Sequence, residues 1–145
     1  MLKEYDSILV MHDLVEQMGR KIVVDKSSNC VGNRSRLWTN EDIDKVMQNN
    51  WGTKEIEGVI SSTSCEVLWD PEAFSTLHNL RLLMISSDFH VPIGLKCLSH
   101  ALKVLYWTKY PLDTLPSGTR LHELVDLRMH HSKLKKLSLV RYLIL

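Results

Sequence analysis

Residues 80–85 read Leu-Arg-Leu-Leu-Met-Ile, and two later stretches repeat this arrangement: residues 102–107 read Leu-Lys-Val-Leu-Tyr-Trp, and residues 124–129 read Leu-Val-Asp-Leu-Arg-Met. Apolar side chains occupy the first, fourth and sixth positions each time, and each stretch begins 22 residues after the previous one. A second apolar set keeps the same spacing later in each unit: Ile93, Leu115 and Leu137. This double register predicts a repeated structural unit.

The pattern L-x-x-L-x-L at this spacing is typical of leucine-rich repeats, whose units are about 20–29 residues long. Each unit is a short strand, a turn and a return that cannot bury its apolar side alone, so consecutive units stack. The sequence therefore predicts an α/β fold, with a leucine-rich repeat solenoid of short parallel strands preceded by a helical segment. The alternative, an ordinary α/β domain with three similar leucine clusters, does not explain the double register.

Side chains alternate along a strand, so the residues between the inward-facing positions are expected to point outward. In a solenoid the outward residues line the concave face, which is the usual site of partner binding. The sequence predicts a protein-binding face that consists of Leu82, Met84, Val104, Tyr106, Asp126 and Arg128.

The composition is that of an ordinary globular chain: 145 residues, 44% of them hydrophobic and 24% charged, with a net charge of +1. Such a charge gives no general attraction to nucleic acid or membranes. Cys30, Cys65 and Cys97 are odd in number and widely spaced, so we expect reduced thiols and a cytoplasmic or nuclear location. We find no metal-ligand spacing and no catalytic order of nucleophile and base, and expect neither a metal site nor an enzyme.

The N-terminal part of the chain carries a helical pattern. Its apolar residues recur at offsets 0, 3, 4, 7 and 11, which predicts an amphipathic helix over residues 11–23: Met11, Leu14, Val15, Met18 and Ile22. Residues 25–32 are expected to form a loop or wing, and residues 34–38 a strand.

Three further elements are expected before the repeats. Thr39 or Asn40 caps a helix over residues 40–50, whose apolar face is Ile43, Val46 and Met47. A strand follows at residues 56–60. Asp70-Pro71-Glu72 predicts another helix start, with Ala73, Phe74 and Leu77 facing inward.

Two positions depart from the repeat pattern. Gly58 and Ser61 stand where a 22-residue register would require leucine, so the first unit is expected to be an atypical terminal repeat. Tyr110 occupies the ninth position of its repeat, where Asn often bonds turn backbone, and is not expected to make such a bond.

Several motifs in order resemble plant TIR-NB-LRR disease-resistance proteins. Met11-His12-Asp13-Leu14 with Gln17-Met18-Gly19-Arg20 is similar to the M-H-D segment that closes the nucleotide-binding region. Arg34-Ser35-Arg36-Leu37-Trp38 and Ile56-Glu57-Gly58-Val59 resemble the linker, and residues 79–83, 102–105 and 110–117 the first repeats. The resemblance covers about residues 8–137.

The resemblance implies a domain organisation. Residues 1–37 correspond to the end of the winged-helix part of the NB-ARC region and residues 38–55 to a helical linker. Residues 56–79 then correspond to the N-terminal capping segment of the solenoid, and residues 80–145 to three truncated leucine-rich repeats. The chain contains no G-x-x-x-x-G-K-[ST] motif, so we expect a fragment of a longer receptor.

The resemblance also implies functions. In the full-length parent, His12 would donate to a phosphate of ADP, with Met11 and Asp13 in structural roles. ADP or ATP is implied only for the parent family, and no cofactor is expected for this fragment. The implied partners are proteins, either the receptor's own NB-ARC core or a pathogen effector, and neither nucleic acid nor membrane. Two alternatives stay open: a generic leucine-rich repeat binding module, or a nucleic-acid-binding winged helix that uses Arg20, Lys21, Arg34 and Arg36.

Overall fold

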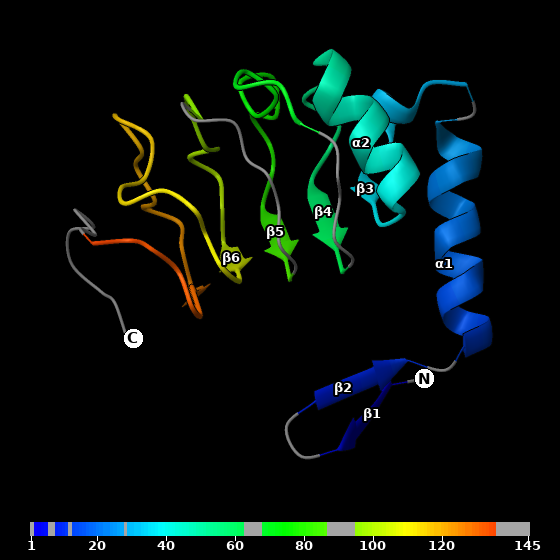
Figure 1. Ribbon diagram of the computed structural model, residues 1–145. Helices are drawn as coiled ribbons and strands as arrows, with labels where there is room; N and C mark the ends of the chain where they lie inside the picture. Colours follow the sequence, from blue (N-terminus) through cyan, green and yellow to red (C-terminus); the bar gives the residue numbers. More distant parts are fainter. Residues whose placement is uncertain are drawn as a thin grey trace.

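The computed structural model describes residues 2–5, 8–11, 13–27, 29–62, 68–86 and 95–135 (Figure 1). Within these ranges the architecture is α/β, with two α-helices, one short 3₁₀ helix, a two-stranded antiparallel hairpin and a five-stranded parallel sheet. The elements are β1 (Leu2–Tyr5), β2 (Ile8–Met11), α1 (Asp13–Lys26), η1 (Val31–Asn33), β3 (Arg36–Leu37), α2 (Asn40–Asn49), β4 (Gly58–Ser61), β5 (Leu82–Ile85), β6 (Val104–Trp107) and β7 (Asp126–Arg128). Within the same ranges, no helix is long and apolar enough to cross a membrane.

The parallel sheet has the order β3-β4-β5-β6-β7, so each strand pairs with the next one along the chain. Leu83 lies opposite Leu105, and Leu105 lies opposite Leu127. The 22-residue spacing of the sequence is therefore the strand register of β5, β6 and β7. Figure 1 shows these strands side by side, with the returning chain on one side of them.

The predicted register of β4 is wrong. Val59 lies opposite Leu83 and Ser61 opposite Ile85, a step of 24 residues rather than 22. Val59 and Ser61 therefore take the inward positions, and Gly58 faces outward opposite Leu82. The reason is that the return between β4 and β5 holds two more residues than the later returns. The column of inward side chains begins at Leu37, which pairs with Val59 at the regular 22-residue step.

Burial follows the predicted alternation in β5 and β6. Leu83, Ile85, Leu105 and Trp107 are at most 1% exposed, whereas the residues between them are half-buried. Leu127 and Met129 pack against the same core, and so do Leu115 and Leu134. Two residues of the repeat pattern, Ile93 and Leu137, lie outside the described ranges.

Aromatic side chains fill the centre of the core. Trp107 contacts Phe74 at 6.3 Å and Tyr110 at 5.0 Å between ring centroids, the second pair edge to face. The expectation for Tyr110 is wrong, because its buried phenol is long enough to reach turn backbone and donates to the Thr114 carbonyl at 3.0 Å. Burial, with a smaller effect of Asp113, raises the pKa of Tyr110 to about 12.

Helix α2 forms as predicted. The Thr39 hydroxyl accepts from the Asp42 amide at 3.3 Å, and Asn50 ends the helix in the left-handed conformation at φ 55°. Ile43, Val46 and Met47 are buried in the common core, which identifies the sheet as their apolar partner.

Helix α1 is longer than predicted at its C-terminal end. It begins at Asp13 and continues to Lys26, so the expected loop over residues 25–32 begins later. The apolar stripe is largely exposed: Leu14 is 59%, Met18 58% and Ile22 53% accessible. The helix is connected to the sheet region through Arg20, whose guanidinium lies 5.4 Å from the centre of the Trp38 ring.

The helix expected after Asp70 is absent from this described segment, and residues 71–76 form consecutive turns. The Asp70 carboxylate accepts from the Glu72 amide at 2.7 Å, and the Ala73 amide donates to the Asp70 carbonyl at 2.9 Å. These bonds span two and three residues, so they close turns rather than an α-helix. Ala73, Phe74 and Leu77 are nevertheless buried, as predicted.

Candidate functional site

The six residues predicted to face outward do lie on one face of the sheet. They form two rows across neighbouring strands, which are about 4.8 Å apart. Leu82, Val104 and Asp126 pair in one row, and Met84, Tyr106 and Arg128 in the other. We call the side of β4–β7 that points away from the core the outward face.

The polar end of the outward face is a three-residue cluster on β6 and β7. The Tyr106 hydroxyl donates to Oδ2 of Asp126, and Nη2 of Arg128 donates to the same oxygen at 3.2 Å. The Arg128 guanidinium also lies 4.5 Å from the centre of the Tyr106 ring, which is cation–π geometry. The three side chains therefore hold one another in a defined arrangement.

This cluster changes the acidity of two of its members. The hydrogen bond from Tyr106 is the main reason that the pKa of Asp126 is lowered, with Arg128 adding to the effect. The same bond to a carboxylate is the main reason that the pKa of Tyr106 is raised. The cluster therefore presents an ionised Asp126, a neutral phenol and a guanidinium at neutral pH.

Ile60 is an outward-facing residue that sequence reasoning missed. It pairs with Met84 and extends the second row onto β4, where its side chain is 38% exposed. The 22-residue register assumed for β4 concealed it, because the actual step is 24 residues. An alternation test at both spacings would have found Ile60.

The opposite end of the outward face is closed by an ion pair. Nη1 of Arg36 on β3 lies 3.0 Å from Oε2 of Glu57. The Arg36 side chain crosses Gly58, where a Cβ atom would lie 2.7 Å from Arg36 Cδ. Glycine at position 58 therefore leaves room for this side chain.

The structure places two residues of the M-H-D segment at a strand-to-helix junction. Met11 is the last residue of β2, and Asp13 is the first residue of α1. His12 between them lies outside the described residues. Its contact with ADP therefore stays a prediction.

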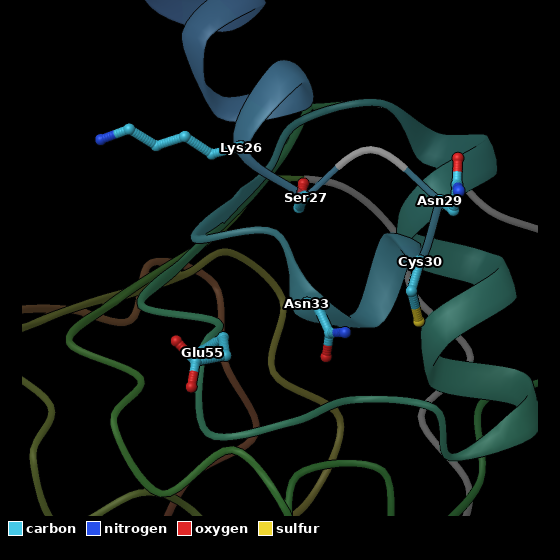
Figure 2. A pocket seen from close by; sticks show the side chains of 6 residues that line it. All are labelled: Lys26, Ser27, Asn29, Cys30, Asn33 and Glu55. Carbon is cyan, nitrogen blue, oxygen red and sulfur yellow. The ribbon is translucent and has the colours of Figure 1, made fainter.

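A polar hollow of about 560 Å³ lies where α1 ends (Figure 2). It is lined by Lys26, Ser27, Asn29, Cys30, Asn33 and Glu55. Figure 2 shows the Lys26 side chain extending away from the other five, so its ammonium does not join them. In the part of the chain that the structure describes, no three His, Cys, Asp or Glu side chains are grouped as a metal site.

The thiols show no reactive environment in the described ranges. Cys30 is exposed and Cys97 is half-buried, and both are free. Burial raises the pKa of Cys97, which disfavours the nucleophilic thiolate. Cys65 lies outside the residues that can be described.

The chain is similar to plant disease-resistance proteins over nearly its whole length. It is 35% identical to disease resistance protein RPP2B of Arabidopsis thaliana across 92% of the chain, and 37% identical to RPP2A of the same plant across 84%. It is 34% identical to TMV resistance protein N of Nicotiana glutinosa across 94% of the chain. No protein-family model and no solved structure matches it.

These relatives are plant TIR-NB-LRR disease-resistance proteins, and the chain belongs with this family. It spans only 12% of RPP2B, 10% of RPP2A and 12% of protein N.

Proposed function

We propose that this chain is a non-catalytic segment of a plant immune receptor, in which the end of the nucleotide-binding region joins a leucine-rich repeat solenoid that recognises proteins. The observation that carries this proposal is the parallel sheet in sequence order, in which three strands follow one another at 22-residue steps. Such stacking is what repeat solenoids do, and their strands offer a continuous face to a partner. The relatives are disease-resistance proteins, which supports a role in defence signalling.

Two protein partners fit this role: the receptor's own NB-ARC core, in an autoinhibitory contact, or a pathogen effector. Both would meet the outward face in the cytoplasm or nucleus. In the parent receptor, His12 is proposed to report the bound nucleotide. The position of Met11 and Asp13 on either side of a strand-to-helix junction supports this, because free N–H groups at a helix start favour anions.

The winged-helix alternative, nucleic-acid binding, has less support. Arg34 is bonded to Asp42 at 2.7 Å and Arg36 to Glu57 at 3.0 Å. Arg20 pairs with Glu16. Three of the four basic residues proposed for this role already face carboxylates, so little positive charge is left for phosphates.

The recognition role is tested in a receptor that carries this segment. Tyr106→Ala and Arg128→Ala are expected to change effector-triggered or effector-independent signalling while receptor abundance stays the same. Arg120→Ala is the matched control, because Arg120 is exposed and lies outside the outward face. If both outward-face variants signal as the wild type does, the proposed contact surface is wrong.

The nucleotide role is tested separately. His12→Ala in the same receptor is expected to reduce the ADP that remains bound after purification. Unchanged ADP content would contradict the role of His12 and leave the recognition role untouched.

A further inference from the structure

We propose that the outward face of β4, β5 and β6 binds an acidic amphipathic segment of a protein partner. This inference rests on the proposed recognition role and names the chemistry of the partner. It is carried by an apolar strip framed by unpaired basic charge. The strip consists of Ile60, Leu82, Met84, Val104 and Tyr106.

The strip is continuous because strand pairing brings its members together. Ile60 pairs with Met84 and Met84 with Tyr106, while Leu82 pairs with Val104. Every one of these side chains points away from the core and remains at least partly accessible. Five adjacent apolar side chains at solvent-facing positions mark a surface that favours contact with apolar groups of a partner.

Basic side chains line the edge of the strip where the strands begin. Arg81 and Lys103 directly precede β5 and β6, and both are exposed. They are neighbours, because the Lys103 amide donates to the Arg81 carbonyl at 2.8 Å. Arg128 supplies a third cation beside Tyr106, at the β7 end of the strip.

Negative charge next to the strip is already engaged. Asp126 accepts from both Tyr106 and Arg128. Residues 95–135 as a whole contain seven Lys and Arg against three Asp and Glu. A partner segment that carries carboxylates beside its apolar side chains would complement both features of this surface.

Nucleic acid and a second copy of the chain fit this face less well. The described residues before position 87 contain eight Lys and Arg against ten Asp and Glu, so a long polyanion would be repelled there. The strip offers a single aromatic ring for base stacking, Tyr106, and Arg128 already lies over it. A second copy would bring its own Arg81 and Lys103 against the same basic edge.

The proposal is tested with peptides on the full 145-residue chain. The probe is a fluorescent peptide of about 12 residues that alternates Leu and Glu, compared with one that replaces Glu by Lys and one that replaces Leu by Ser. Anisotropy is expected to show binding about tenfold tighter for the Leu–Glu peptide than for either control peptide. The Leu–Glu affinity is expected to fall between about 50 and 300 mM salt.

Matched variants locate the contact. Lys103→Glu and Met84→Ser are each expected to weaken binding about fivefold or more. Lys21→Glu and Met18→Ser make the same chemical changes on the exposed surface of α1, and are expected to bind as the wild type does. Far-UV circular dichroism checks that all four variants fold alike.

Several outcomes would overturn the proposal. These are equal binding of the Leu–Lys peptide, equal weakening by Lys21→Glu, displacement of the peptide by single-stranded DNA of similar length, or a dimer in sedimentation that Met84→Ser abolishes. If the peptide fails but Tyr106→Ala still changes receptor signalling, the face binds protein of another chemistry. If the receptor variants also signal normally, the proposed function itself fails.

Discussion

The hydroxyl of Tyr106 on β6 donates to the carboxylate of Asp126 on β7, and this one bond shifts the pKa values of both groups in opposite directions. Tyr106→Phe removes the donor and keeps the ring. We expect the pKa of Asp126 to rise toward its ordinary value, because the largest cause of its lowering is gone. A carboxyl-carbon NMR titration measures it. Tyr110→Phe, which alters a phenol bonded elsewhere, is expected to leave the Asp126 titration unchanged, and a shift in that control would contradict the assignment.

The alternation of β6 predicts unequal costs for adjacent truncations. Leu105→Ala empties a fully buried position, whereas Val104→Ala shortens a half-buried side chain on the outward face. Leu105→Ala is expected to lower the free energy of unfolding by about 2–5 kcal/mol, and Val104→Ala by about 1 kcal/mol or less. Urea denaturation followed by circular dichroism distinguishes them. Equal losses would mean that the two side chains do not face opposite sides.

Two glycines should respond to alanine with opposite signs. A Cβ atom at Gly32 would lie 2.0 Å from the Trp51 carbonyl oxygen, so Gly32→Ala must displace backbone. We expect it to lower the melting temperature. Gly19 lies within α1 with nothing within 4 Å of a Cβ atom, so Gly19→Ala is expected to stabilise the helix by about 0.5–1 kcal/mol. Thermal melts of both variants provide the comparison, and a stabilised Gly32→Ala protein would rule out the close approach.

Stability is expected to fall at alkaline pH because of Tyr110. Its pKa is raised to about 12 in the folded chain, above the ordinary tyrosine value of about 10. The unfolded chain therefore loses this proton first. The contribution of Tyr110 to stability is complete below about pH 10 and is lost as the pH rises through about 12.

The measurement is the free energy of unfolding at several pH values from 9 to about 12. Tyr110→Phe, which cannot ionise, should show a smaller decline over this range than the wild type. The variant also loses the hydrogen bond to Thr114, so its stability at neutral pH is expected to be lower by about 0.5–1.5 kcal/mol. Parallel pH profiles for the two proteins would contradict the raised pKa.

The features that the sequence predicts well are those decided by local pattern. The pairing of β5, β6 and β7 follows from leucines at a constant spacing, and α2 follows from a cap, an acidic first turn and one apolar face. The outward positions of the predicted binding face then follow from strand alternation alone. These residues needed no information about distant parts of the chain.

The features that were missed depend on contacts between distant residues. The turns after Asp70 are held by its amide, which donates to the Met47 carbonyl at 2.9 Å, and by the Lys96 amide, which donates to the Pro71 carbonyl at 3.2 Å. Helix signals at residues 70–72 carry no trace of these partners. Ile60 was missed for a related reason, because the length of the return before β5 sets its position and no residue of β4 encodes that length.

The longer step from β4 to β5 shows where this architecture can absorb change. The sheet keeps its register across that step, since Val59 still meets Leu83, so the two added residues are taken up wholly by the return. A one-residue slip within a strand would instead turn every side chain to the opposite side. Coil length and face chemistry are therefore separate variables: insertions and deletions can remodel one flank of the molecule while substitutions at the outward positions evolve independently.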